Sequence, residues 1–375
     1  MKPVERALHE AVRRLPSCTD TPRLDAELLM AHALGIERDR LILSPPDGPV
    51  PPAFDELLQR RCAGEPVAYI TGRRAFWNIE LEVGPGALIP RPDSETLIEA
   101  AIDHFGTASP SLILDLGTGP GTLLLAALDL WPAATGLGID RSEAALGYAR
   151  RNAERLGLAA RATFRMGDWA EGIQDRFDLL LCNPPYVATD DELGPGVAEH
   201  EPAEALFGGS DGLDDYRRLA PVVGTLLRKG GLAAIEIGFD QADRAAALFA
   251  KAGLSPTLAH DLAGRPRATL DAQARGDPGP GRVEVGKGGL VPYVEAAVAR
   301  LQEPAADEIE PGMDLREAHQ DGDEALLGPD EHPVLVDARR DRPGLEAEHA
   351  GLTGRGAGRL DRTRRPASGP PSRSP

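Results

Sequence analysis

An asparagine, two prolines and a tyrosine at positions 183–186 directly follow an apolar run at residues 177–182. Adjacent prolines lack backbone N–H donors, so a central strand must end here. The side-chain oxygen of Asn183 and the carbonyl of Pro184 offer acceptors for both hydrogens of a planar NH2 group. We therefore predict Asn183, Pro184 and Tyr186 as catalytic residues, with Pro185 joining them in the substrate-binding set.

The chemistry expected of this tetrad is attack by a weakly nucleophilic, planar nitrogen. Positive charge develops on that nitrogen as it reacts, and two fixed acceptors stabilise it. The prolines hold the carbonyl rigidly, and Tyr186 can stack on the planar group. The tetrad by itself does not separate adenine or cytosine in nucleic acid from glutamine or asparagine in protein.

A glycine-rich turn, Gly117-Thr118-Gly119-Pro120-Gly121, follows another apolar run. Glycines there let a ligand approach the backbone closely. The spacing G-x-G-x-G departs from the dinucleotide fingerprint G-x-G-x-x-G. Asp115 also places a negative charge where a pyrophosphate would be unfavourable. A ligand that carries an ammonium group fits this turn better.

Two further strand ends carry polar or aromatic groups. Asp140 lies 23 residues after Gly117, where a carboxylate can accept from both hydroxyls of a ribose, although it could instead cap the next helix. Asp168 can accept from an adenine amino group, and Trp169 can lie on the adenine face or pack in the core. The combination predicts S-adenosylmethionine as cofactor, with S-adenosylhomocysteine as its product. The predicted cofactor-binding residues at these strand ends are Gly117, Thr118, Gly119, Pro120, Gly121, Asp140, Asp168 and Trp169.

Other reactive side chains receive a structural interpretation. Cys182 lies on an apolar strand without an evident base, so we expect a buried thiol. Glu199, His200 and Glu201 are candidate bases, but a loop that forms a wall of the site is the favoured interpretation. The sequence has no cysteine spacing typical of a metal site, and no metal is expected.

The order of the elements indicates an α/β protein. Residues 1–64 read as a small helical domain, and residues 65–92 as a hairpin linker. From 93 to 272 strands and helices alternate, which predicts an open, mostly parallel sheet with helices on both faces. Asp93 or Ser94 is expected to cap the first helix of this domain.

The chain end has a different composition. Residues 273–375 contain 15 Gly and 12 Pro, about a quarter of the segment. Such a segment cannot bury enough apolar area to offset chain entropy, so we predict a disordered, low-complexity tail. It could also be an artefact of a frameshifted end.

Charge and hydropathy restrict the partners. The 375-residue chain carries a net charge of −18, which argues against stable nucleic-acid binding and favours a basic protein partner. It has three cysteines, no apolar segment of membrane-spanning length and no signal peptide. We expect a cytoplasmic monomer.

Several blocks of sequence together resemble the HemK/PrmC family of protein-(glutamine-N5) methyltransferases. They include "GEPVAYITGRRAFWNIELEVGPGALIPRPDSETLIE", "ILDLGTGPGTLLLAAL", "FDLLLCNPPYVA", "EHEPAEALFGGSDGLDDYRRL" and "IEIGFDQ". The first and fourth are the most specific, because the glycine turn and NPPY also occur in adenine-N6 DNA methyltransferases. The likeness covers residues 1–272.

The resemblance implies a class I methyltransferase domain, Rossmann-like with a seven-stranded, mostly parallel sheet, behind five N-terminal helices that help to dock the partner. It also implies that Asn183 joins the cofactor-binding residues. It implies transfer of a methyl group to the glutamine of the Gly-Gly-Gln motif in class 1 peptide chain release factors, which supports translation termination. Pro120 stands where many relatives carry a small residue such as serine. Two alternatives stay open: a glutamine methyltransferase acting on a ribosomal protein, and a DNA adenine-N6 methyltransferase, for which the chain lacks a basic target-recognition domain.

Overall fold

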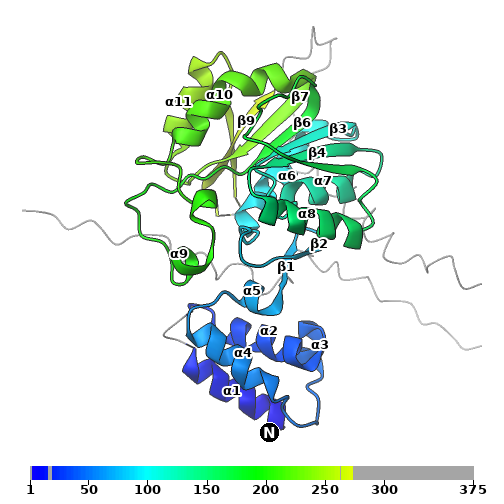
Figure 1. Cartoon of the computed structure of the whole chain (residues 1–375), viewed down its shortest axis with the longest axis vertical. Coiled ribbons are helices and arrows are strands. Elements are labelled where there is room, and N and C mark those ends of the chain that lie inside the picture. The colour runs from blue at the N-terminus through cyan, green and yellow to red at the C-terminus, as the bar shows by residue number, and fades with distance from the viewer. Residues whose placement is uncertain (1, 16–18, 262, 273–375) are drawn as a thin grey trace, which may run out of the picture. The chain divides into compact units, whose positions relative to one another are not determined.

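A computed structural model of the chain describes residues 2–15, 19–261 and 263–272 (Figure 1). The predicted tail at 273–375 lies outside these residues. Two compact units are present in the described residues: those up to Gly64 together with Glu192–Val197, and Glu65–Asp191 together with residues 198–272. Within the described ranges, no helix combines the length and apolar character needed to cross a bilayer.

The first unit is built from helices that pack around apolar side chains. Its elements are α1 (Pro3–Arg14), α2 (Pro22–Leu34), α3 (Arg38–Leu43) and α4 (Ala53–Cys62). Apolar residues recur at helical spacing, so Val4, Leu29 and Leu58 are buried. Gly35 ends α2 with φ of 64°, a left-handed conformation that glycine adopts without steric cost. The predicted helical character of this region is confirmed.

The segment that opens the second unit is partly helical. The predicted hairpin is confirmed as β1 (Arg73–Phe76) and β2 (Ile79–Glu82), which pair antiparallel. The preceding residues form a short helix, α5 (Val67–Thr71), rather than the start of the hairpin. Pro66 precedes this helix, and Gly72, with φ of 73°, ends it.

The predicted seven-stranded, mostly parallel sheet is confirmed, in the order β5-β4-β3-β6-β7-β9-β8. The first five strands in that order run parallel, and β9 pairs antiparallel with both β7 and β8. The strands are β3 (Leu112–Leu116), β4 (Thr135–Asp140), β5 (Ala162–Met166), β6 (Phe177–Cys182), β7 (Leu227–Glu236), β8 (Thr257–His260) and β9 (Pro266–Ala272).

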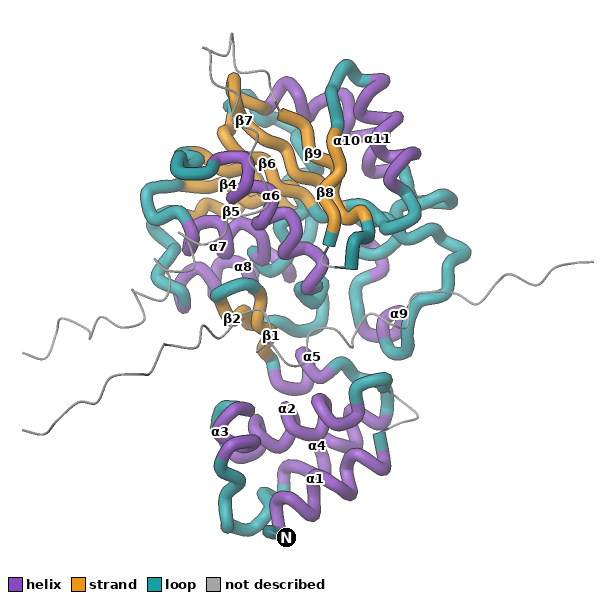
Figure 2. Tube along the Cα trace, turned by 180° about the vertical axis from the view of Figure 1, so that it is seen from behind, coloured by secondary structure: helices purple, strands orange, loops and turns teal. Residues whose placement is uncertain are grey.

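Helices cover both faces of this sheet, as the doubly wound pattern requires (Figures 1 and 2). One apolar cluster joins the sheet to α6 (Glu95–Phe105), α7 (Thr122–Leu130) and α8 (Glu143–Arg155). The other joins it to α10 (Asp214–Leu226) and α11 (Ala242–Lys251). Shorter helical turns are η1 (Pro92–Ser94), α9 (Val197–His200) and η2 (Ala203–Ala205).

The strand order changes direction between β3 and β6. The chain passes from β3 outward to β4 and β5, then returns to place β6 on the other side of β3. Ligands of such sheets bind outside the carboxyl ends of the strands at this switch point. Leu116 pairs with Cys182, so Gly117 and Asn183 leave the sheet as neighbours.

Candidate functional site

A cavity opens at the switch point, within the second unit. It gathers these residues of the predicted cofactor set: Gly117, Thr118, Gly119, Pro120, Asp140, Asp168, Trp169 and Asn183. Gly121 is not in the lining. A Cβ at Gly121 would lie 2.7 Å from Leu125 Cδ1, so this glycine serves the packing of α7 against the turn.

The Asp140 carboxylate accepts hydrogen bonds from two backbone N–H groups, one in the glycine turn and one just before α8. The Gly119 N–H donates to Asp140 Oδ2 at 2.8 Å, and the Ser142 N–H donates to Oδ1 at 2.8 Å. The side chain that caps α8 is Ser142, which accepts from the Ala145 N–H. Asp140 is therefore not the cap, and its half-buried carboxylate, which keeps further lone pairs, faces the cavity.

Asp115 contributes a buried carboxylate to the same wall. Its Oδ2 accepts from the Thr118 hydroxyl at 2.6 Å and from the Leu124 N–H at 3.2 Å. Its Oδ1 has no hydrogen-bond partner among the described residues. Burial raises the pKa of Asp115 to about 7. A cationic ligand would stabilise the ionised form here, because a nearby positive charge offsets the cost of burying a carboxylate.

The aromatic wall is held by α10. Trp169 adopts φ of 49°, and its indole N–H donates to Asp215 Oδ1 at 3.1 Å. The ring lies against the glycine turn, where a Cβ on Gly117 would be 3.2 Å from Trp169 Cζ3. Asp168 accepts from Arg218 at 2.5 Å. Both side chains of the predicted adenine platform are thus oriented by one turn of α10, a function of "DDYRR" that the sequence did not reveal.

The 183–186 segment meets the cavity through only part of its length. Asn183 and Pro185 line the cavity, whereas Pro184 and Tyr186 do not. The Asn183 amide donates through Nδ2 to Ser94 Oγ at 3.0 Å. Ser94 in turn donates to Glu236 Oε2 at 2.5 Å. The predicted capping role of Asp93 or Ser94 is wrong: Ser94 occupies the N-cap position of α6 without a side-chain capping bond, because its hydroxyl is used in this chain.

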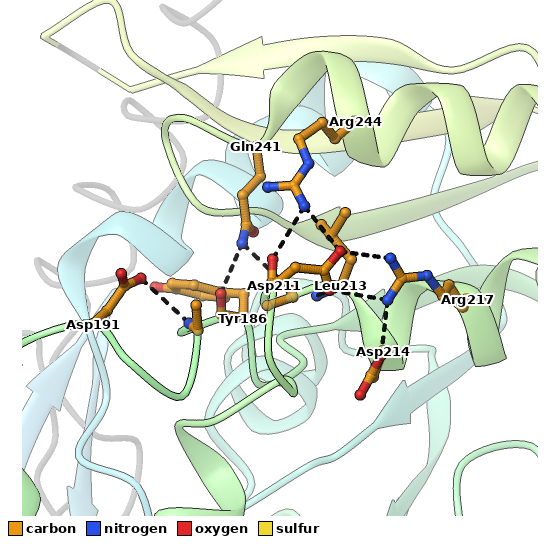
Figure 3. Close-up of polar contacts among 10 residues, drawn as sticks. Tyr186, Asp191, Asp211, Leu213, Asp214, Arg217, Gln241 and Arg244 are labelled. Atoms are coloured by element: carbon orange, nitrogen blue, oxygen red, sulfur yellow. Dashed lines mark hydrogen bonds and ion pairs between the residues drawn. The ribbon is translucent and has the colours of Figure 1, made fainter. Parts of the chain in front are cut away.

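Tyr186 is fixed at both ends. Its hydroxyl donates to Glu236 Oε1 at 3.2 Å. Its carbonyl accepts from Gln241 Nε2 at 2.8 Å, as Figure 3 shows. The loop at 208–213 lies against the same backbone. A Cβ on Gly208 would lie 2.4 Å from the Pro185 oxygen, and one on Gly212 would lie 2.3 Å from the Tyr186 oxygen. Close packing of this kind requires glycine at both positions.

Ion pairs hold the 208–213 loop in place. Asp211 accepts from Arg217 at 2.6 Å and from Arg244 at 2.9 Å, as Figure 3 shows. The Arg217 hydrogen bond lowers the pKa of Asp211 to about 2, so this carboxylate stays ionised at neutral pH. The block "GGSDGLDDYR" therefore packs against the backbone of the Asn-Pro-Pro-Tyr segment and holds it in position.

Two of the remaining candidates, Glu201 and Cys182, have structural roles. Glu201 is buried and accepts from Arg91 at 2.5 Å and from the Ile89 N–H at 3.0 Å, so both its oxygens are engaged. Its neighbours Pro202, Glu204 and Ala205 form a wall of the cavity. Cys182 is buried, and burial raises the pKa of its thiol. No group of side chains that could hold a metal ion occurs among the described residues.

Taken together, the cavity fits S-adenosylmethionine on chemical grounds. The orphaned Asp115 oxygen suits a positively charged group, the Asp140 carboxylate suits hydroxyls, and the indole of Trp169 suits a flat base.

Comparisons with known proteins cover both units. The PrmC N-terminal domain family matches residues 6–72, and a methyltransferase domain family matches residues 109–233. A release factor glutamine methyltransferase of Caulobacter vibrioides is 43% identical over 258 residues, which span 67% of this chain and 89% of that protein. One of Rhodospirillum rubrum is 43% identical over 268 residues, 70% of this chain and 82% of its own length. A solved methyltransferase of Pyrococcus furiosus covers 53% of this chain and 91% of its own, with a TM-score of 0.40 and 19% identity.

Proposed function

The chain belongs to the family of release factor glutamine methyltransferases, and we propose that it methylates the side-chain nitrogen N5 of the glutamine in the Gly-Gly-Gln motif of class 1 release factors. The observation that carries this proposal is Asn183. It stands beside the glycine turn, and its amide nitrogen is engaged by Ser94, which leaves the amide oxygen as an acceptor for an incoming NH2 group.

S-adenosylmethionine supplies the electrophilic methyl group. We assign its binding to the eight predicted residues that line the cavity, whereas Gly121 packs α7 against the turn. Among the eight, Asp140 receives the ribose hydroxyls and Trp169 covers the adenine. Asp115 joins them as a counter-charge within the cavity. The hydrogen bonds from Gly119 and Asp215 hold the acid and the indole in place before the cofactor arrives.

The glutamine amide is held by residues 183–186. Asn183 Oδ1 and the Pro184 carbonyl accept its two N–H groups, so that its nitrogen is aimed at the methyl group. As that nitrogen attacks, it gains positive charge, and both acceptors stabilise it more strongly than they do the neutral amide. The nitrogen–carbon bond would form as the carbon–sulfur bond of the sulfonium breaks, which leaves S-adenosylhomocysteine, and one amide proton would then leave to solvent. Tyr186 stacks on the amide plane. Its fixation by Glu236 and Gln241 lets it do so with little loss of entropy.

The net charge of −18 supports a protein rather than a nucleic-acid substrate. We propose that the helices at residues 1–64 help to dock the release factor, and that the enzyme works in the cytoplasm as a monomer.

Mass spectrometry provides the direct test. The protein is incubated with S-adenosylmethionine and a purified class 1 release factor, and the peptide that contains Gly-Gly-Gln is analysed. We expect one added methyl group on the glutamine and none when that glutamine is replaced by alanine. Methylation of DNA or of a ribosomal protein, without methylation of this peptide, would refute the proposal.

Asn183→Ala tests the role of the amide. Removal of one preorganised hydrogen-bonding group at a charge-developing atom costs about 10²–10³ in kcat. Cofactor binding, measured by calorimetry, should be weakened but present. The matched control is Asn78→Ala, since Asn78 is exposed in the β1–β2 turn, and it should leave both quantities unchanged. Turnover of Asn183→Ala at the wild-type rate would contradict the assigned role.

A further inference from the structure

A buried hydrogen-bond chain runs beneath the Asn183 amide. Its members come from distant parts of the sequence: Ser94 from η1, Glu236 from the end of β7, and Asn183 from the end of β6. Ser94 and Glu236 are only 2% and 1% exposed, and of the two only Ser94 lines the cavity. Cys182 pairs with Ile235 in the sheet, and this register brings Asn183 next to Glu236.

The direction of this chain is dictated by its last member. An ionised carboxylate only accepts hydrogen bonds, so the single hydrogen of the Ser94 hydroxyl points to Glu236. Ser94 then has only lone pairs left for Asn183. The nitrogen of the Asn183 amide must face Ser94, and its oxygen must face the opposite way.

We propose that Glu236 and Ser94 are positioning residues that set the orientation of the Asn183 amide, so that its oxygen is presented to the substrate nitrogen. This inference rests on the proposed function, since orientation matters only if an N–H donor is the guest. If the chain were reversed, Asn183 would present its own N–H groups to those of the substrate, and donors would face donors.

The groups around Glu236 allow the protonation that a reversed hydrogen-bond chain requires. Asp93 of η1 and Arg267 of β9 are the charged groups that act on it, with opposite signs. Tyr186 donates to its Oε1, Tyr216 of α10 donates to its backbone oxygen, and the thiol of Cys182 on β6 is also nearby. Burial raises the pKa of Glu236 to about 7.

Protonation of Glu236 allows the hydrogen-bond chain to reverse its direction. A protonated carboxyl can donate to Ser94, which frees the Ser94 hydrogen to point to Asn183. The Asn183 amide then turns over to accept it. Methyl transfer should therefore lose rate as the pH falls below about 7, although the cofactor site stays intact.

Glu236→Gln separates this role from a merely structural one. In this variant every donor is satisfied when the glutamine oxygen accepts from Tyr186 and the glutamine nitrogen donates to Ser94. This arrangement reverses the hydrogen-bond chain. We expect kcat at pH 8 to fall about 10²-fold or more, as for Asn183→Ala, because the reversed amide presents donors to the donors of the substrate. The acid limb of the kcat profile near pH 7 should disappear. Cofactor affinity should change less than twofold, because Glu236 does not line the cavity.

Asp178→Asn is the matched control. Asp178 also accepts from a serine hydroxyl, that of Ser111 at 2.6 Å, but at the opposite end of β6. This variant should keep the wild-type kcat and its acid limb. If Glu236→Gln fails to fold, two variants of Ser94 provide the test. Ser94→Ala should lose about tenfold in kcat, and Ser94→Thr, which keeps the hydroxyl, should retain most of the wild-type kcat.

A spectroscopic readout tests the orientation without relying on activity. In protein labelled with ¹⁵N-asparagine, the Asn183 side-chain amide signals, identified by their loss in Asn183→Ala, should titrate near pH 7. The titration should be absent in Glu236→Gln. Unchanged signals across pH 5.5–8, or an acid limb that persists in Glu236→Gln, would overturn the inference. Absence of glutamine methylation by the wild type would refute the proposed function instead, and the titration would still decide the orientation.

Discussion

Replacement of Gly208 by alanine should disable transfer by displacing the Asn-Pro-Pro-Tyr segment. The new Cβ would lie 2.4 Å from the Pro185 oxygen, whereas ordinary contacts begin at 3.4 Å, so the backbones must separate by about 1 Å. The loop cannot simply retreat, because the Gly208 N–H donates to the Val187 oxygen at 2.9 Å and Asp211 is anchored by Arg217. A misplacement of about 1 Å costs roughly 10²-fold in rate, or about 2.7 kcal/mol of activation free energy.

The assay measures kcat with saturating S-adenosylmethionine and release factor, alongside thermal unfolding and cofactor affinity. Gly208→Ala should bind the cofactor nearly as well as the wild type, because Gly208 lies outside the cavity lining. Gly147→Ala is the control: its Cβ would be 3.5 Å from Arg151 Nη1, and alanine favours the α8 helix. A Gly208→Ala enzyme that stays folded and retains its kcat would refute the view that this loop fixes the segment.

Three further predictions concern the cofactor cavity. Asp140→Ala should raise the Kd for S-adenosylmethionine about 10- to 100-fold by calorimetry, because hydrogen bonds to a carboxylate are lost; an unchanged Kd would argue against the ribose role. Since burial raises the pKa of Asp115 to about 7, affinity should rise with pH up to that value and level off above it, and Asp115→Asn should flatten the curve. A pH-independent wild type would contradict this role. Trp169→Ala should weaken binding about tenfold through lost stacking, and Trp169→Phe should recover part of it; equal affinities of wild type and both variants would exclude an adenine platform.

Much of the fold could be predicted because it depends on local patterns. The strands at 112–116 and 177–182 are mostly apolar runs that are followed by Gly117 and by Asn183, and parallel strands bring such ends to one edge. This logic was sufficient to place Gly117 beside Asn183. The hairpin was predicted too long, because Pro66 and Gly72 enclose a helical turn whose residues are also typical of strands.

The residues that support the site could not be predicted from the sequence, because their positions depend on sheet register and on contacts between distant segments. Ser94 has the type and position of a helix cap, yet Glu236 draws its hydroxyl away from the helix end. Glu236 itself carries a signal that could have been used: a charged residue inside the apolar run "LAAIEIG" must find partners when it is buried. Gln241 and Gly208 carry no such local signal.

The ion pairs of Arg267 determine when the site can be completed during synthesis of the chain. Arg267 lies on β9, almost at the end of the described chain, and pairs with Asp93 at 2.7 Å and Asp261 at 2.9 Å. Asp93 adjoins the serine on which the Asn183 amide depends. A ribosome that makes this protein therefore completes the glycine turn and the Asn-Pro-Pro-Tyr segment long before it supplies the residue that secures η1. We expect nascent chains that stop before β9 to lack methyltransferase activity, whereas chains released after Ala272 possess it.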